Sequence, residues 1–280
     1  MNAPDLLAGR YRLDESVGHG GMAVVFGAFD TVLERPVAIK YFQTHLMREP
    51  VLVERFRREA LAAAKIVHPN VVAIHDIGIG DDDRPFIVME LVAGPSLAEL
   101  LRAGPLPDRR AARIGAGIAR GLAAAHAFGF IHRDVKPANV MIAADDLAKL
   151  TDFGLVFEAG EDAPPSDLTM HGAMVGSAAY VAPEQARYGE ASAASDLYAL
   201  GCTLYETVAG VPPFSGATAI DQAVKRLVEA PEPVAIRAPG IQPALAALIM
   251  ELLVRDPQRR RDDAGEVGDE LASIGDAGPD

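Results

Sequence analysis

The chain has 280 residues, 50% of them hydrophobic and 23% charged, a globular composition that suffices for two packed lobes and excludes a disordered chain. The formal net charge of −13 argues against a nucleic-acid partner, because contacts to phosphates need lysine and arginine. The single cysteine, Cys202, excludes an internal disulfide and suits a reducing compartment, so we expect this chain to be cytoplasmic.

The first part of the chain has the pattern of strands around one helix. Three β-branched runs, RPVAIKYF, VVAIHDIGI and PFIVMEL, are bounded by turn residues and predict strands. Between the first two runs, apolar residues at Phe56, Ala60 and Ala63 have helical spacing. The polar stretch from Asp81 to Arg84 predicts a solvent-exposed hairpin loop.

After this part the pattern becomes helical. Ser96 and Glu99 have capping-box spacing before a short helix. A long helix is predicted over 108–128, with Gly129 where a left-handed C-cap would end it. A loop rich in proline, glycine and acids is predicted over 157–174, and the last hundred residues or so predict helices interrupted by proline and glycine.

No apolar run reaches the length of a membrane span, so we expect no membrane segment in this chain. The first ten residues also lack the basic and then apolar pattern of a signal peptide. Together the elements predict an α+β fold with a small β-rich lobe and a larger helical lobe.

A glycine-rich stretch, VGHGGMAVV, lies between two predicted strands. Glycine lets the backbone approach phosphate groups closely and present N–H groups to them. A plain glycine-rich turn explains this stretch alone equally well, and no GK[ST] follows as a P-loop would require.

Lys40 ends the apolar run VAIK, where a lysine is usually a surface residue. A phosphate-binding lysine needs a carboxylate to hold its ammonium group, and Glu59 on the predicted helix is a candidate. Taken singly, solubility explains both residues. Together with the glycine-rich stretch they favour a phosphate site.

The stretch HRDVKPAN concentrates an acid, two cations and an amide, which would be costly to bury unpaired. Phosphoryl transfer needs mainly positioning and charge neutralisation. Asp134 could orient a hydroxyl and accept its proton, and Lys136 could neutralise a γ-phosphate. Asn139 and the later Asp152, in TDFG, offer the oxygen ligands that Mg²⁺ prefers.

With these motifs the chain resembles a eukaryotic-type (Hanks-type) protein kinase domain, in particular the bacterial serine/threonine kinases of that family. The matching motifs occur in the family's order: GHGGMAVV, VAIK, Glu59, HRDVKPAN, DFG, APE and SDLYALG. The resemblance implies a bilobal kinase domain over about 11–274, with an N-lobe at 11–90, a hinge at 90–94, a C-lobe at 95–274 and flexible ends at 1–10 and 275–280.

The resemblance implies ATP as cofactor with Mg²⁺, which Mn²⁺ could replace. It implies Asp134 as catalytic base, Lys136 as γ-phosphate contact, and Asn139 and Asp152 as metal ligands. Lys40, oriented by Glu59, would hold the α- and β-phosphates. The residues implied to contact the nucleotide are Val17, Gly18, His19, Gly20, Gly21, Met22, Ala23, Val24, Val25, Ala38, Lys40, Met89, Glu90 and Val92.

Ala23 stands where the family has its third glycine, and we expect a tuned nucleotide affinity from this departure. By resemblance, Asp196 would anchor the backbone at His132 and Arg133, and Glu184 would pair with Arg260. His132 and Phe153 resemble packing residues of the family's core.

The implied activity is transfer of the γ-phosphate to Ser/Thr hydroxyls of proteins. Because Arg133 precedes Asp134 as in relatives that bind an activation-segment phosphate, we expect autophosphorylation mainly at Thr169; alternatively, Thr169 is an ordinary loop residue. The family also allows a homodimer for trans-autophosphorylation. Two other functions are open: a pseudokinase or nucleotide-binding signalling scaffold, which the complete catalytic set argues against, and a small-molecule kinase, which the APE motif disfavours.

Overall fold

The computed structural model describes residues 6–21, 23–153, 179–216 and 219–277. Met22, Thr169 and the predicted loop 157–174 lie outside these ranges. The chain divides into two compact units, the first formed by Met1–His68 and Val72–Val92 and the second by Pro69–Val71 and Ala93–Asp280.

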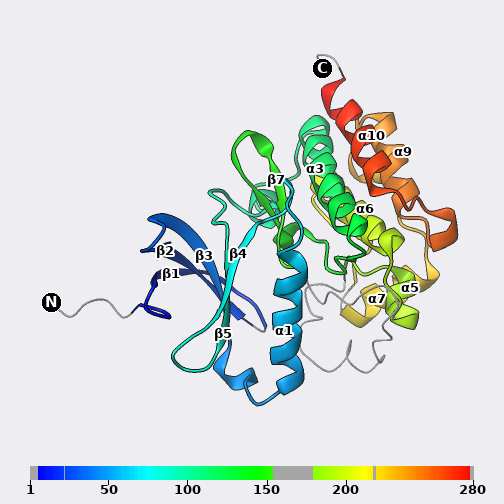
Figure 1. Ribbon diagram of the computed structural model, residues 1–280. Coiled ribbons are helices and arrows are strands. Elements are labelled where there is room, and N and C mark those ends of the chain that lie inside the picture. The colour runs from blue at the N-terminus through cyan, green and yellow to red at the C-terminus, as the bar shows by residue number, and fades with distance from the viewer. Residues whose placement is uncertain (1–5, 22, 154–178, 217–218, 278–280) are drawn as a thin grey trace. The chain divides into compact units, whose positions relative to one another are not determined.

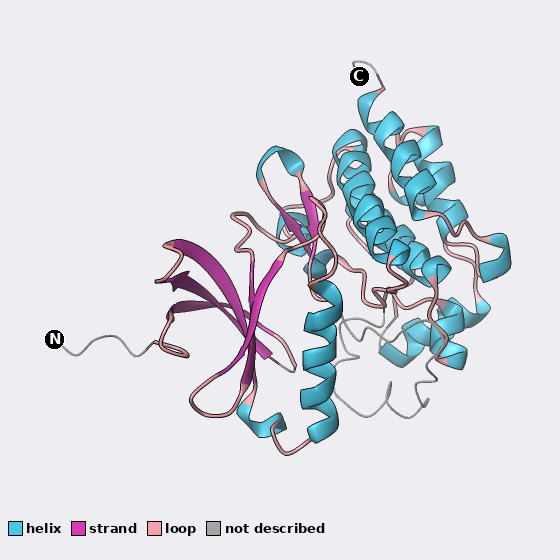
Figure 2. Ribbon diagram, viewed as in Figure 1, coloured by secondary structure: helices cyan, strands magenta, loops and turns pink. Residues whose placement is uncertain are grey.

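The first unit contains an antiparallel sheet of five strands in the order β1-β2-β3-β5-β4, with α1 packed beside it (Figure 1 and Figure 2). The strand β3 pairs with β2 on one side and with β5 on the other. The elements are β1 Tyr11–His19, β2 Ala23–Asp30, β3 Arg35–Phe42, the 3₁₀ turn Thr44–Leu46, α1 Pro50–Ala63, β4 Ile74–Ile79 and β5 Pro85–Met89.

The two faces of this sheet are covered differently because successive side chains of a strand point to opposite faces. On one face, Val37, Ile39 and Tyr41 of β3 belong to an apolar cluster that includes Phe86. On the other face Phe42 packs against α1, and its ring centroid lies 5.2 Å from that of Phe56. The alternation therefore places Lys40 on the same face as Ala38 and Phe42.

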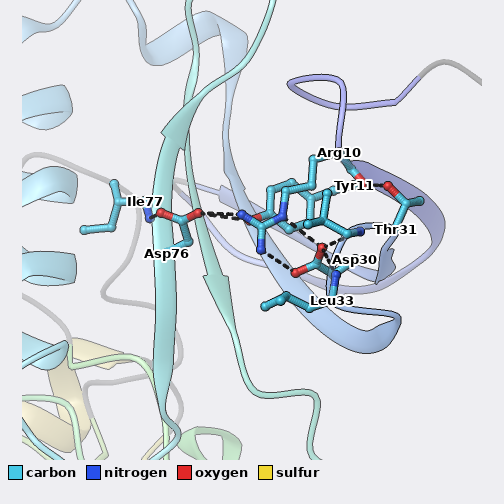
Figure 3. A network of polar contacts seen from close by, with 8 residues as sticks. Arg10, Tyr11, Asp30, Thr31, Leu33, Asp76 and Ile77 are labelled. Carbon is cyan, nitrogen blue, oxygen red and sulfur yellow. Dashed lines mark hydrogen bonds and ion pairs between the residues drawn. The ribbon is translucent and has the colours of Figure 1, made fainter.

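A polar network ties the start of β1 to β2 and β4 (Figure 3). The guanidinium of Arg10 donates to both carboxylate oxygens of Asp30, at 2.8 and 2.7 Å, and lies 3.4 Å from Asp76. The hydroxyl of Tyr11 also donates to Asp76, at 3.0 Å. The side chain of Asp30 is only 1% exposed, and the hydrogen bond from Arg10 lowers the pKa of its carboxyl.

The second unit is mainly helical and contains the two-stranded hairpin of β6 and β7. The helices α3 and α10 lie side by side, and α6 packs against α3 and α9 (Figure 1). The elements are α2 Leu97–Leu101, α3 Asp108–Ala127, β6 Val140–Ile142, β7 Ala148–Leu150, α5 Pro183–Tyr188, α6 Ala193–Ala209, α7 Ala219–Val228, α8 Val234–Arg237, α9 Pro243–Leu252 and α10 Ala264–Asp276. Short 3₁₀ turns span Pro137–Asn139, Ala144–Asp146 and Pro257–Arg259.

Two helix-end predictions are confirmed. Ser96 and Glu99 form the capping box of α2, in which Glu99 N–H donates to the Ser96 hydroxyl at 3.2 Å and Ser96 N–H to the Glu99 carboxylate at 2.8 Å. After α3, Gly129 has a φ of 76°, the left-handed conformation in which glycine is favoured. Within the described ranges, no helix combines the length and apolar character needed to cross a bilayer.

One predicted strand begins later than its sequence pattern indicates. The apolar run starts at Val71, but β4 begins at Ile74. Val71 instead forms an isolated bridge with Leu150, and the neighbouring Asn70 donates its side-chain amide to Ala148 O at 2.8 Å. Both residues therefore belong to the second unit, and the apolar side chain of Val71 is buried there.

Candidate active site

The glycine-rich stretch forms the turn between β1 and β2. Gly18 lies opposite Val25 in the pairing of the two strands, and Gly20 N–H donates to Ala23 O at 2.9 Å. A Cβ added to Gly21 would meet no protein atom within 4 Å, so packing among the described residues does not require glycine there. The side chain of Gln43 donates to Gly20 O at 2.7 Å and ties the turn to the end of β3.

Four of the residues predicted to contact the nucleotide lie in one apolar cluster of the first unit. Ala38 and Met89 are buried and pack with Val25 and Val92. Val17, another predicted nucleotide contact, is 63% exposed and lies at the surface of β1. The cluster also includes Val72 and Ile74, which the sequence analysis did not assign to the site.

Glu90 follows β5 and is held by two backbone contacts. Its N–H donates to Ala73 O at 2.9 Å, and its carboxylate accepts from Ala73 N–H at 3.3 Å. The division between the two units falls a short distance later, between Val92 and Ala93.

Lys40 lies on β3, opposite Val25 on β2 and Ile87 on β5, and its side chain is half-buried. Glu59 lies in the C-terminal half of α1. The side chains of His19 and Glu59 are outside the described parts of the structure, and an ion pair between Lys40 and Glu59 therefore stays a prediction.

In the second unit, three predicted site residues meet at one carboxylate. The ammonium group of Lys136 donates to Oδ2 of Asp134 at 2.7 Å. The amide nitrogen of Asn139 donates to the same oxygen at 2.9 Å and to the backbone oxygen of Asp134 at 2.9 Å. Asn139 thereby turns its amide nitrogen toward Asp134 and its amide oxygen away from it.

The hairpin of β6 and β7 brings the fourth residue to the same end of the unit. Asn139 directly precedes β6, and Thr151 and Asp152 directly follow β7, while Val140 pairs with Leu150. Thr151 N–H donates to Asn139 O at 3.0 Å, which extends the pairing by one step toward Asp152. The separation of Asn139 and Asp152 in sequence is therefore the length of one short hairpin.

The backbone that carries Asp134 is held by a buried carboxylate on α6. Asp196, 1% exposed, accepts from the backbone N–H groups of His132 and Arg133, both at 2.8 Å. Its Oδ2 atom also lies 2.9 Å from Nε2 of His126, at the end of α3. The predicted anchoring role of Asp196 is confirmed by these contacts, and the contact to His126 is additional.

The buried ring of His132 fixes the same segment from within. It packs against Phe153, with ring centroids 4.7 Å apart, which agrees with the predicted packing role of both residues. Burial lowers the pKa of His132 and favours a neutral ring. A neutral ring fits both contacts, since Nε2–H can donate to Thr151 O at 3.2 Å while Nδ1 accepts from Asp134 N–H at 3.3 Å.

A buried ion pair connects the APE motif to the following helices. Arg260 donates to the two carboxylate oxygens of Glu184, at 2.7 and 3.1 Å, and also to Ala194 O at 2.7 Å. The predicted pair of Glu184 and Arg260 is therefore confirmed. The adjacent Gln185 donates to Arg133 O at 3.4 Å, so α5 also contacts the catalytic segment.

Sequence reasoning missed a further pair near this segment. The Tyr180 hydroxyl donates to the Glu206 carboxylate at 2.5 Å. Burial and this contact raise the pKa of Tyr180, and burial raises that of Glu206. No local signal could have found the pair, because its members come from a loop and from α6.

Comparisons with known proteins identify the family. The family described as the protein kinase domain matches residues 11–265. The chain is 40% identical over 278 residues to the serine/threonine-protein kinase PknB of Mycobacterium leprae, covering 98% of this chain and 44% of that protein. It is 39% identical to a probable serine/threonine-protein kinase of Streptomyces coelicolor, covering all of this chain and 42% of that protein.

A crystal structure of Rad53 1-466 in complex with AMP-PNP has the same fold, with a TM-score of 0.76, 28% identity, and coverage of 94% of this chain and 65% of that one. The chain belongs to the protein kinase domain family, and more narrowly it is similar to the bacterial serine/threonine kinases named above. The α+β kinase fold and the family predicted from the sequence are confirmed. The chain spans less than half the length of these two bacterial relatives.

Proposed function

We propose that this domain transfers the γ-phosphate of ATP to serine and threonine hydroxyls of proteins. The observation that carries the proposal is the meeting of Lys136 and Asn139 at Oδ2 of Asp134. This arrangement orients the carboxylate through Oδ2, and Oδ1 is proposed to accept the proton of an attacking hydroxyl. The relatives named as serine/threonine-protein kinases support the choice of hydroxyl.

In this proposal Lys136 has two tasks. It fixes Asp134 and brings a positive charge to the γ-phosphate as negative charge develops during transfer. Its side chain is 20% exposed and that of Asp134 30%, so both are partly shielded and still accessible to a substrate.

The divalent metal of the kinase reaction is proposed to be Mg²⁺, held by Asn139 and Asp152. Both residues provide oxygen ligands, and the hairpin brings their backbones to the same end of β6 and β7. Mg²⁺ is usually bound by one or two carboxylates together with phosphates and waters, so the protein needs to supply only a few ligands. Mn²⁺ would be the substitute.

The nucleotide is proposed to bind to the first unit. The apolar cluster of Val25, Ala38, Met89 and Val92 would contact the adenine, with backbone groups of Glu90 and Val92 at its edge. The turn at 18–23 would cover the phosphates, and the open space around Gly21 supports this. Lys40, oriented by Glu59, would hold the α- and β-phosphates.

The test is transfer of radiolabelled phosphate from ATP to a generic basic protein. We expect Asp134→Asn to lower kcat by about 100-fold or more while binding of a fluorescent ATP analogue is retained. Lys40→Met should abolish transfer as well. If the wild-type chain binds nucleotide but transfers no phosphate, the pseudokinase alternative is correct.

We further propose that the domain phosphorylates itself mainly at Thr169, which lies outside the described residues. The phosphate would pair with the guanidinium of Arg133 as a charge-assisted contact. Phosphosite mapping by mass spectrometry after incubation with ATP, compared with Lys40→Met, tests this. A fully active enzyme with unmodified Thr169 would contradict it.

Autophosphorylation is proposed to occur between two copies of the chain, in the reducing cytoplasm. If it occurs in trans, the initial rate should rise with the square of the protein concentration, whereas a reaction within one copy gives a first-order dependence. Cell fractionation tests the location. Limited proteolysis tests the proposed domain extent of 11–274.

A further inference from the structure

A three-residue segment, Pro69–Val71, belongs to the second unit although it lies in sequence between two segments of the first. Asn70, at its centre, is 6% exposed. The strand β7 pairs with β6 along one edge. At the other edge, Leu150 N–H donates to Asn70 O at 2.8 Å, and Val71 forms a parallel bridge with Leu150. The segment therefore lies beside β7 as a short third partner of the hairpin.

The side chain of Asn70 makes a second contact to the same strand. Its amide nitrogen donates to Ala148 O at 2.8 Å, in a buried hydrogen bond. A strand of three residues that paired only with β6 would be weakly held, because an isolated two-stranded hairpin is marginally stable. Asn70 therefore holds β7 at both ends, through its side chain at Ala148 and through its backbone oxygen at Leu150.

The helix α3 provides the space in which Asn70 lies, and it packs beside β7 (Figure 1). A Cβ added to Gly117 would lie 2.9 Å from Nδ2 of Asn70. A Cβ added to Gly121, about one turn later, would lie 2.7 Å from the backbone oxygen of Asn70. Both distances are shorter than van der Waals contact, so a larger residue at either position would displace Asn70. The two glycines thus fit α3 to a buried asparagine.

The strand that Asn70 holds leads directly to a proposed metal ligand. Asp152 lies two residues after Leu150, the last residue of β7. Thr151 N–H, between them, donates to Asn139 O at 3.0 Å, so the hairpin sets the separation of the two proposed ligands. A shift of β7 against β6 would change the distance between Asn139 and Asp152. Metal sites lose affinity when the groups that orient their ligands are disturbed.

We propose that Asn70 is a positioning residue for the metal site. By holding β7, it places Asp152 where this carboxylate binds Mg²⁺ together with Asn139. The inference rests on the proposed function, in which these two residues are the metal ligands. Asn70 itself contacts neither metal nor substrate, and its effect passes through the backbone of β7.

The test measures binding of a fluorescent, non-hydrolysable ATP analogue to the full chain, once in excess Mg²⁺ and once in EDTA. The wild-type chain should bind the analogue more tightly with Mg²⁺, because the metal joins the phosphates to its protein ligands. Asn70→Ala should raise the Kd in Mg²⁺ by about tenfold and the Kd in EDTA by less than about twofold. A general loss of stability would affect both values alike.

A second variant disturbs the same contact from the helix. Gly117→Ala places its Cβ against the amide of Asn70 and should raise the Kd by about threefold or more in Mg²⁺ only. The matched control is Gly115→Ala on the opposite side of α3, where the Cβ would lie 2.7 Å from Cδ2 of Leu204. It should change neither Kd by more than about twofold. Amide hydrogen exchange over 148–152 should be faster in the first two variants and unchanged in the control.

The proposal is overturned if Asn70→Ala and Gly117→Ala leave the Kd in Mg²⁺ unchanged or weaken binding equally in Mg²⁺ and in EDTA. It is also overturned if the wild-type chain does not bind the analogue, or binds it equally well with and without Mg²⁺. If thermal melting shows that Asn70→Ala does not fold, Gly117→Ala decides alone. Phosphate transfer by the wild-type chain is measured separately. Its absence would refute the proposed function and leave a Mg²⁺-specific effect of Asn70 intact.

Discussion

Asp196 offers the sharpest test of how the catalytic segment is held. Its carboxylate accepts from two backbone N–H groups, those of His132 and Arg133, and contacts the ring of His126. In Asp196→Asn the amide oxygen can replace only one of the two carboxylate oxygens. If it occupies the place of Oδ2, the contacts to His132 and His126 remain, and the amide NH₂ faces the N–H of Arg133.

The cost of this change can be estimated from its parts. One donor at Arg133 loses its acceptor and meets another donor, which costs about 1–3 kcal/mol. The remaining contacts change from charge-assisted to neutral hydrogen bonds, which adds about 1 kcal/mol. We therefore expect Asp196→Asn to lower the free energy of unfolding by about 2–4 kcal/mol.

The same substitution should affect the reaction, because Arg133 directly precedes Asp134. A displacement of the catalytic group by about 1 Å can cost on the order of 100-fold in rate. We expect kcat to fall by about that factor, with KM for ATP changed by less than about threefold, since the proposed nucleotide contacts lie elsewhere. Urea unfolding and steady-state phosphate transfer measure the two effects independently.

A matched control is Asp269→Asn on α10. Its carboxylate is 83% exposed and makes one long contact to Arg120, at 3.4 Å, so removing its charge should alter neither stability nor rate appreciably. If Asp196→Asn behaves like this control in both assays, the carboxylate does not hold the catalytic segment and the reasoning fails.

Three further changes have defined outcomes. Asp30→Asn removes a carboxyl group whose pKa is lowered by the hydrogen bond from Arg10. The ionised carboxylate stabilises the fold fully at pH values above the unfolded pKa of about 4. The difference in unfolding free energy between wild type and variant, measured by urea unfolding, should therefore be constant from about pH 7 to 5 and shrink at lower pH. Gly201→Ala would place a Cβ 2.8 Å from the Cβ of Leu252, between α6 and α9. The free energy of unfolding should fall by about 1 kcal/mol in the same assay, because the cost of overpacking exceeds the gain in helix propensity. A more stable variant would contradict this. Burial raises the pKa of the Cys202 thiol to about 12. A thiol reagent at pH 8 should therefore label the native chain only at the rate at which the chain unfolds. Rapid labelling without denaturant would show that the thiol is accessible and would contradict this.

Much of the local structure could be predicted from sequence because its causes are local. Gly129 ends α3 through its left-handed conformation, and Ser96 begins α2 through a capping box, as the spacing indicated. Lys136 and Asn139 reach Asp134 because they lie two and five residues after it, on one short stretch of backbone. Such contacts need no knowledge of the remaining fold.

Other contacts could not be predicted because they join distant segments. Gln43 contacts Gly20 across the end of a strand, and Tyr180 contacts Glu206 across a loop and a helix. Glutamine, tyrosine and glutamate each have many ordinary roles at a protein surface, so their residue types alone did not indicate these contacts. The late start of β4 has the same origin, since Val71 was interpreted by its apolar character and its partner, Leu150, lies in the second unit.

The catalytic segment shows how these two levels combine. Arg133 and Asp152 both have left-handed backbone conformations, with φ of 66° and 53°, which cost non-glycine residues roughly 1–3 kcal/mol each. Aspartate adopts this conformation more readily than most residues, but no local pattern favours it at Arg133. The peptide groups at Arg133 are instead held from outside the segment, by Asp196 at the N–H and by Gln185 at the carbonyl. The motif therefore supplies the chemical groups, and hydrogen bonds from α5 and α6 supply the strained geometry in which Asp134 is presented.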